Sequence, residues 1–445
     1  MKLLIVDPSG NGLDFALRAQ QAGHDVRLMI RQSEKTKNIG RGLVQVVEAY
    51  EPWMRWADLV FMTDNTKYTY DLDQRWRPYG VKIVGASIET AQWEIDRVAG
   101  MKIFKKAGIA VPEYREFSDY DKAISYVKKE DRRFVSKPCG EIDDKALSYC
   151  ARSPVDMVYM LQRWKKLGKH KQSFILQEFI GGTEMAVGGW FGPGGFNVGW
   201  CENFEFKKLM VGDMGPATGE QGTVLRYVRN SRLARKVLEP LAPILEAAGY
   251  VGYVDVNCIV DDSGDPWPLE FTMRPGWPTF NIQQVLHKGD PVKWLMELHN
   301  GRDQRNAEMN TVAIGVVVSI PDYPYSHLTR KEVTGIPVYG LEDMENIHPC
   351  EMMLKTAPNE VQGQIVDMPM MCTAGDYVLV ATATADDVSS AVKTVYARLD
   401  KISLPNSPMY RTDIGKRLAK QLPKLHAMGY ATGLEFSTPA RSLSA

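Results

Sequence analysis

The sequence is poor in the side chains that bind metals through nitrogen or sulfur. Its 445 residues include only 7 histidines and 6 cysteines, with no C-x-x-C spacing and no histidines spaced as a ligand pair. This pattern argues against a zinc site and against a disulfide framework. We therefore expect a reduced, cytoplasmic protein.

Net charge and long apolar runs are also absent. Lysine plus arginine equals aspartate plus glutamate at 54 each, so no whole-molecule field attracts nucleic acid or an anionic membrane. No apolar run approaches the roughly 20 residues that span a bilayer, and the start is too short for a signal peptide. With 44% hydrophobic residues, the chain can bury a large core divided among two to four domains.

The first 95 residues have the pattern of alternating strands and helices. Short apolar runs predict buried strands at residues 3–6, 26–30, 59–62 and 81–84. A glycine turn at residues 8–12 leads into a helical stretch that ends at Gly23. The turn lacks the third glycine of a dinucleotide-binding G-x-G-x-x-G motif. We expect a parallel sheet with helices on both faces.

Basic and acidic residues then recur at the ends of predicted elements. A helix over 96–107 carries Arg97 and Lys102, the segment 134–140 is a strand with Lys137 at its end, and a loop leads to Lys145. The next segment, 173–184, is a strand that turns through two glycines to Glu184. Each feature alone is typical of a solvated surface, so only their combination carries information.

The segment 207–222 joins two lysines to a loop with little apolar mass. Glycines allow backbone N–H groups to approach a charged group closely, Asp213 and Thr218 offer polar contacts, and Lys207 supplies positive charge. A flexible surface connection is the alternative for such a loop.

This order of residues resembles the ATP-grasp superfamily, in which two α+β lobes hold ATP between them. The resemblance implies that the hinge backbone binds adenine, that Glu184 binds the ribose, and that Lys137 and Lys145 bind phosphates. The hinge residues are Gln177, Glu178, Phe179 and Ile180. It also implies a further phosphate contact from Arg97 or Lys102 and a magnesium or manganese site at Glu270 with Asn257. A buried structural role for Asn257 is the equal alternative.

Four longer motifs resemble the phosphoribosylamine–glycine ligase family of purine biosynthesis within this superfamily. They are Gly85–Ser87 with Ala91–Glu94, Lys207–Gly222, Gly264–Pro266 with Leu269–Arg274, and Tyr410–Gly415. The family forms an amide bond through an acyl phosphate and uses ATP. The resemblance implies small-molecule amino acid and amine substrates, glycine among them, and a monomer or homodimer. It assigns Arg274 and Lys207 to catalysis and Asp213, Thr218, Gly219 and Arg274 to substrate binding.

The family layout predicts an α/β and α+β chain in four parts. These are an N-terminal parallel-sheet domain (1–95), two ATP-grasp lobes (96–190 and 191–330) and a small C-terminal α/β domain (331–432), followed by a tail (433–445).

Several departures from the family lie where the acceptor substrate would bind. The basic first turn of the family is replaced by Leu13, Asp14 and Phe15, and two further motifs change at Glu220–Gln221 and at Pro275–Thr279. Replacing a cation by leucine and adding an aspartate weakens binding of a phosphomonoester. These changes favour a retained ATP site with an altered amine or acid substrate. Authentic phosphoribosylamine–glycine ligase activity is the alternative.

Two departures concern the ATP site itself. Glu141, Asp143 and Asp144 precede Lys145 in the phosphate lid, and Thr272 replaces an asparagine of the metal motif. Carboxylates in a lid repel a triphosphate unless they face solvent or hold a cation. They favour a second interpretation, a non-catalytic nucleotide-binding descendant, although the retained lysines and glutamates favour the ligase.

Overall fold

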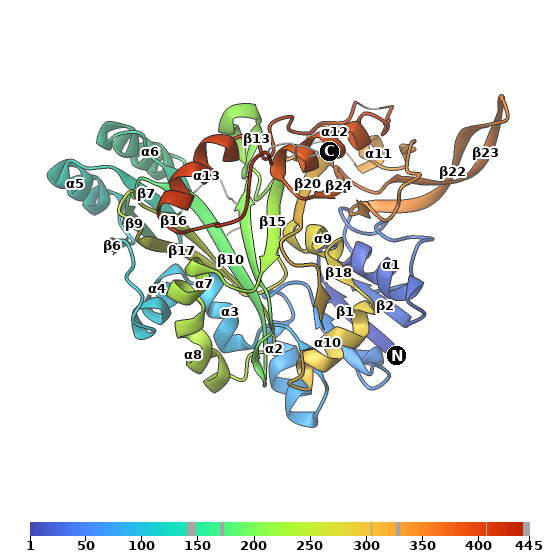
Figure 1. Cartoon of the computed structure of the whole chain (residues 1–445), viewed down its shortest axis with the longest axis horizontal. Coiled ribbons are helices and arrows are strands. Elements are labelled where there is room, and N and C mark those ends of the chain that lie inside the picture. Colours follow the sequence, from blue (N-terminus) through green and yellow to red (C-terminus); the bar gives the residue numbers. More distant parts are fainter. Residues whose placement is uncertain (140–147, 170–172, 304, 326–329, 406, 439–445) are drawn as a thin grey trace, which may run out of the picture.

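The computed structural model describes residues 1–139, 148–169, 173–303, 305–325, 330–405 and 407–438. It shows a mixed α/β chain with three main sheets (Figure 1). A β-hairpin over residues 352–373 projects from the rest of the chain. Among the described residues, no helix combines the length and the apolar composition needed to cross a bilayer.

The N-terminal sheet is parallel, as the sequence predicted, with strand order β3-β2-β1-β4-β5. Its strands are β1 (Lys2–Asp7), β2 (Asp25–Ile30), β3 (Val46–Val47), β4 (Leu59–Met62) and β5 (Ile83–Val84). Alternate residues of β1 enter different core clusters, one with helix α1 (Leu13–Gln21) and the other with residues 47–76. The sheet is therefore covered on both faces, which explains why its strands are apolar throughout.

A four-stranded antiparallel sheet forms the lobe at the left of Figure 1, with strand order β6-β9-β7-β8. Its elements are β6 (Tyr114–Phe117), α5 (Tyr120–Glu130), β7 (Phe134–Pro138), β8 (Tyr149–Cys150), α6 (Pro154–Lys166) and β9 (Phe174–Glu178). Phe117, Phe134 and Phe174 belong to a core cluster that is separate from the main one. This lobe thus has its own hydrophobic core.

The central sheet has nine strands, joined by antiparallel pairings. In chain order they are β10 (Thr183–Gly192), β11 (Gly195–Phe196), β12 (Trp200–Glu205), β15 (Gly222–Val228), β16 (Gly252–Val260), β17 (Pro266–Thr272), β20 (Val312–Ser319), β21 (Ile347–Pro349) and β24 (Tyr377–Ala385). The sheet continues from β20 to β24 and β21, across the expected boundary at residue 330. The four-part division of the chain remains a prediction.

Helices and short ribbons surround this sheet. The helices are α2 (Thr69–Asp71), α3 (Ile88–Ile95), α4 (Arg97–Lys106), α7 (Arg232–Val237), α8 (Ala242–Ala247), α9 (Thr279–Gln284), α10 (Pro291–His299), α11 (Arg330–Val333), α12 (Val388–Leu399) and α13 (Leu418–Ala427). The ribbons are β13 (Lys208–Met210) with β14 (Met214–Ala217), β18 (His287–Lys288) with β19 (Asn306–Ala307), and β22 (Met352–Val361) with β23 (Gln364–Thr373).

The start of α4 is fixed against β17 from two directions. The Asp96 carboxylate caps the helix by accepting hydrogen bonds from the N–H groups of Val98 (2.8 Å) and Ala99 (3.2 Å). About two turns further on, the ring of Phe104 stacks on that of Phe271 with centroids 4.0 Å apart. Together these contacts hold Arg97 beside the strand that carries Glu270.

Candidate active site

Glu270 is the centre of an ion-pair cluster that several elements build together. Arg97 Nη1 of α4 lies 2.7 Å from Glu270 Oε2, and Lys207 Nζ lies 3.6 Å from Oε1. Burial acts to raise the pKa of Glu270, but Arg97, Lys207 and Lys137 lower it well below its usual value. This carboxylate is therefore ionised at neutral pH.

Lys137 on β7 reaches the same cluster from the separate lobe. Its Nζ donates a hydrogen bond to the carbonyl of Leu269 at 2.9 Å, and the side chain is buried. The pKa of Lys137 is lowered to about 7, chiefly by burial; Glu270 opposes this shift, while the nearby cations Arg97 and Lys207 add to it. A lysine held this way gains protonation when an anion such as a phosphate group approaches.

Lys207 lies among three carboxylates. Its Nζ is 2.8 Å from Glu184, 3.0 Å from Glu205 and 3.6 Å from Glu270. Although burial acts to lower the pKa of Lys207, these carboxylates raise it well above its ordinary value. The cation is fixed at the junction of β10, β12 and β17.

Asn257 on β16 links two of those carboxylates. Its Nδ2 donates to Glu184 at 3.0 Å and to Glu205 at 2.9 Å. Its buried Oδ1 has no hydrogen-bond partner among the described residues. Asn257 stands opposite Glu270 in the register of β16 and β17. The amide is thus oriented by structural contacts while one oxygen acceptor remains unsatisfied.

This donor set fits a magnesium ion, since oxygen ligands are what Mg²⁺ prefers. The unsatisfied Oδ1 of Asn257 and the ionised carboxylate of Glu270 are such ligands. Within the described ranges, no group of three or more histidine, cysteine, aspartate or glutamate side chains is arranged to hold a metal. An ion that takes most of its ligands from ATP phosphates and water needs only one or two protein ligands.

The predicted adenine hinge is a β-strand end with its side chains already engaged. The side chain of Gln177 is buried, with its Nε2 3.9 Å from the sulfur of Met101, and Glu178 forms an ion pair with Arg132 at 3.2 Å. The N–H groups of Glu178 and Phe179 donate to the carbonyls of Glu113 and Arg133. An adenine contact would therefore use other backbone groups of the segment, which continues to Ile180.

The glycine-rich loop is attached to the C-terminal region. Arg411 Nη1 lies 2.8 Å from Asp213 Oδ1, and Arg417 Nη1 lies 3.2 Å from Oδ2. Gly212, Gly215 and Gly219 have φ angles of 73°, 77° and 90°, which side chains with a Cβ rarely adopt. Asp213 is thus engaged within the protein.

Thr218 in the same loop also makes internal contacts. Its Oγ1 donates to the carbonyl of Lys207 at 3.1 Å and accepts from Gln221 Nε2 at 2.9 Å. These bonds fix the course of the loop next to Lys207.

Arg274 follows β17 and is paired with a motif residue of α3. Its Nη2 lies 3.1 Å from Glu94 Oε1, and the other oxygen of Glu94 accepts from Asn65 Nδ2 and from the N–H of Met273. The Arg274 side chain keeps 29% exposure, so part of its guanidinium faces outward. The pairing orients the guanidinium beside the Glu270 strand.

The side chains that replace the basic first turn of the similar family are buried or paired within the protein. Leu13 and Phe15 are buried, and Asp14 lies 2.8 Å from His348 Nδ1 and 3.0 Å from Arg18 Nε. The carboxylate of Asp7 accepts hydrogen bonds from the N–H groups of Ser9 and Gly10 at the start of α1. Carboxylates thus occupy a turn where the related family carries basic and polar groups.

Some predicted residues fall outside this arrangement. Lys145 and the acidic residues Glu141, Asp143 and Asp144 lie outside the described ranges. Lys102 is exposed on α4, whereas Arg97 of the same helix contacts Glu270. Of these two candidates for a further phosphate contact, Arg97 is the one that lies in the Glu270 cluster.

Sequence reasoning missed Glu205, which contacts both Lys207 and Asn257. The signal was present in Phe204–Lys207, where apolar and charged residues alternate. Such alternation places Glu205 and Lys207 on one face of an extended segment. Glu94 belongs to the motif Ala91–Glu94, but the motif did not predict its pairing with Arg274.

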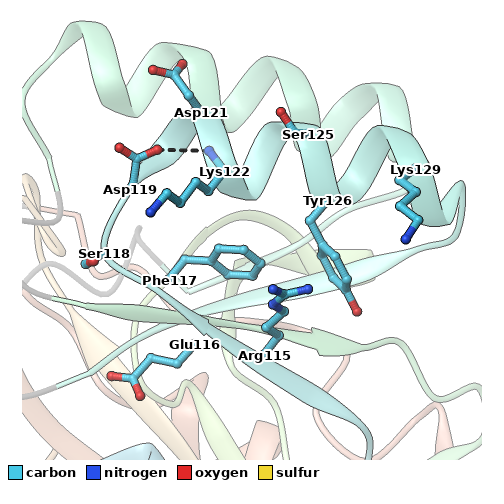
Figure 2. Close-up of a pocket in the computed structure, with 10 residues that line it drawn as sticks. All are labelled: Arg115, Glu116, Phe117, Ser118, Asp119, Asp121, Lys122, Ser125, Tyr126 and Lys129. Atoms are coloured by element: carbon cyan, nitrogen blue, oxygen red, sulfur yellow. Dashed lines mark hydrogen bonds between the residues drawn. The ribbon is translucent and has the colours of Figure 1, made fainter.

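A separate pocket of about 600 Å³ lies on the four-stranded lobe, between β6 and α5 (Figure 2). The Arg115 guanidinium lies 5.0 Å from the centre of the Tyr126 ring and 5.6 Å from that of Phe117. None of the cluster residues around Glu270 lines this pocket.

The chain is similar in sequence to proteins of purine biosynthesis. Residues 99–279 match the family described as phosphoribosylglycinamide synthetase, ATP-grasp (A) domain. A phosphoribosylamine–glycine ligase of Salmonella typhimurium is 24% identical over 81% of this chain and 83% of its own length. A bifunctional purine biosynthetic protein of Pichia angusta is 26% identical over 78% of this chain, and the match spans 43% of that longer protein.

Solved structures show the same fold. Phosphoribosylamine–glycine ligase of Thermotoga maritima aligns with a TM-score of 0.71 at 19% identity, covering 93% of this chain and all 100% of that one. A biotin carboxylase of Campylobacter jejuni, solved as an ATP complex, aligns with a TM-score of 0.60 at 12% identity, covering 96% and 97%. Residues 99–279 thus match an ATP-grasp domain family, and the chain is similar to phosphoribosylamine–glycine ligases over most of its length.

Proposed function

We propose that the chain is an ATP-dependent carbon–nitrogen ligase that joins an amino acid, with glycine as the first candidate, to an amine. The main support for this proposal is the Glu270 cluster. It brings together side chains from different elements, namely Lys137, Arg97, Lys207 and Glu184. Cations and carboxylates alternate there around a strand end. Such a set suits a polyphosphate with its counter-ion.

The reaction we propose proceeds through an acyl phosphate. The substrate carboxylate attacks the γ-phosphate of ATP, ADP leaves, and the amine then displaces phosphate from the acyl carbon. Lys137, Arg97 and Lys207 neutralise charge that develops on the phosphoryl oxygens. Glu184 accepts hydrogen bonds from the ribose hydroxyls, and the segment Gln177–Ile180 contacts adenine.

Glu270 and Asn257 would hold the magnesium ion, which supplies charge neutralisation on the ATP phosphates. Manganese offers the same chemistry. Arg274 then orients the substrate carboxylate or stabilises the acyl phosphate, because its planar fork suits either group and Glu94 fixes its position. Backbone N–H groups of the loop around Asp213, Thr218 and Gly219 contact the amino acid substrate.

The acceptor amine is proposed to differ from phosphoribosylamine. Leu13 and Phe15 are buried and Asp14 is paired internally, so this turn offers a phosphate no cation. The experiment is a matrix of amino acids and amines in which ATP-dependent phosphate release is measured and product masses are determined. Efficient formation of glycinamide ribonucleotide would instead support the authentic family activity.

One observation favours a second candidate, a nucleotide-binding protein without ligase activity. Lys207 and Arg97 are both paired with carboxylates. ATP must therefore compete with internal partners for these cations. Nucleotide binding without phosphate release for any amine in the matrix would support this candidate.

A further inference from the structure

Three consecutive residues of α9 connect the altered segments of the acceptor side. Thr279 Oγ1 lies 3.4 Å from Glu220 Oε1, and Asn281 Nδ2 lies 3.5 Å from Asp14 Oδ2. Between them, the Phe280 ring packs on Phe15 with centroids 5.5 Å apart. Departures that are about two hundred residues apart in sequence therefore meet at one helix.

Glu220 is the most unusual member of this group. The side chain belongs to a residue with 8% exposure, and among the described residues its carboxylate has Thr279 as the hydrogen-bond donor. Burial raises the pKa of Glu220 well above its usual value, and the neighbouring carboxylates of Glu205 and Asp255 add to the rise while Lys207 opposes it. No arginine or lysine forms an ion pair with this carboxyl within the described ranges.

Glu220 forms the inner end of an acidic row, which we define as Glu184, Glu205, Asp255 and Glu220. The side chains of Glu184 and Glu205 are 29% and 17% exposed, whereas Asp255 and Glu220 are 5% and 8% exposed. Lys207 is the cation of the row, and it lies at the outer end against Glu184 and Glu205. Acidic side chains therefore continue inward, and no ion pair joins Asp255 or Glu220 to a cation among the described residues.

Buried acceptors beside this row also lack donors. Asn203 is fully buried, its Nδ2 donates to Asp255 at 2.8 Å, and its Oδ1 has no partner among the described residues. Thr223, which stands opposite Glu205 in the register of β12 and β15, likewise has an unpartnered Oγ1. Buried polar atoms are normally satisfied, so these atoms indicate a missing donor.

We propose that the inner end of the acidic row is a subsite for a cationic group of the acceptor, a protonated amine or a guanidinium, with Glu220 as its specificity-determining contact. The inference rests on the proposed ligase function and names the acceptor class. A cation with several N–H donors satisfies Glu220 and the unpartnered oxygens together. The group enters from the Lys207 end, which places the acceptor beside the ATP site.

The test is calorimetric titration of the full chain with 1,4-diaminobutane, its neutral analogue 1,4-butanediol and inorganic phosphate. We expect the diamine to bind about 10- to 150-fold more tightly than the diol, as a charge-assisted contact implies, and phosphate not to bind at this subsite. Glu220→Gln removes the ionisable carboxyl at nearly constant shape and should abolish that preference. Glu220→Gly, which removes the whole side chain, should do the same.

Matched measurements separate this inference from the proposed function. Glu220→Gln should bind a non-hydrolysable ATP analogue as the unaltered chain does and should keep its melting temperature. Asp262→Asn, which alters an exposed carboxylate, should keep the diamine preference. No preference in the unaltered chain, or an equal one in Glu220→Gln, overturns the subsite. Failure of the unaltered chain to bind the ATP analogue instead overturns the ligase function.

Discussion

The two sides of the candidate site differ in how their charges are balanced. On the nucleotide side, Glu270 and Lys207 each have partners of opposite sign within 3.6 Å. On the acceptor side, Glu220 has a hydroxyl as its partner and Phe15 packs in an aromatic cluster. The proposed nucleotide side thus carries paired charges of both signs, while the proposed acceptor side carries a buried acid and apolar side chains.

The largest expected effect tests the metal position on the nucleotide side. Glu270→Gln should abolish magnesium-dependent turnover, because an amide in place of the carboxylate loses the charge that holds the ion to the phosphates. Asn257→Ala should reduce turnover less, since Asn257 contributes one neutral oxygen. Phosphate release at several magnesium concentrations measures both. Normal turnover and magnesium dependence in Glu270→Gln would place the metal elsewhere.

A smaller loss is expected for nucleotide binding. Lys137→Ala and Glu184→Ala should each lower the affinity for an ATP analogue by about 10- to 150-fold. This corresponds to the loss of a charge-assisted contact of roughly 1.5 to 3 kcal/mol. Calorimetric titration gives the affinities, with exposed Lys102→Ala as the control on the neighbouring helix. Unchanged affinity in both variants would contradict the ATP-site assignment.

On the acceptor side, the comparison predicts a loss of stability. Asp14→Asn removes the charge from a buried carboxylate that contacts both His348 and Arg18, so the free energy of unfolding should fall by about 1 to 3 kcal/mol. Denaturant unfolding measures the change, and affinity for the ATP analogue should stay constant. A stable variant that gains affinity for inorganic phosphate would show instead that Asp14 acts by repelling anions.

The contrast also shows how far the sequence could be read. The parallel sheet followed from apolar runs bounded by turns, since β1, β2 and β4 coincide with the expected strands within a residue at each end. The position of Lys137 at a strand end was predictable for the same reason. Local patterns set both features.

Pairings between distant segments were not predictable in this way. Asp213 lies against Arg411 and Arg417, and Asp14 lies against His348, across separations of about two hundred and three hundred residues. Such contacts depend on how whole elements pack, which spacing along the chain does not encode. The same holds for the burial of Glu220, whose sequence neighbours are glycine and glutamine.

The smallest expected effect concerns protons at the nucleotide side. Lys137 has a pKa of about 7, below the ordinary 10.5, because it is buried near Arg97 and Lys207. Below pH 7 it is protonated with or without a ligand, so binding should exchange no proton there. Between pH 7 and 10.5 the free site has lost the proton, and anionic phosphates raise the pKa and restore it.

When an ATP analogue binds at pH 8 to 9, Lys137 should therefore take up close to one proton. The affinity for the analogue should fall by at most about tenfold per pH unit above 7. Calorimetric titrations in two buffers of different ionisation enthalpy measure the uptake. Lys137→Arg is the matched control, since a guanidinium stays charged throughout this range and should remove the Lys137 contribution to the uptake. Equal uptake by the two proteins would show that Lys137 keeps its proton in the free site. The charge balance of the nucleotide side would then be complete before ATP arrives.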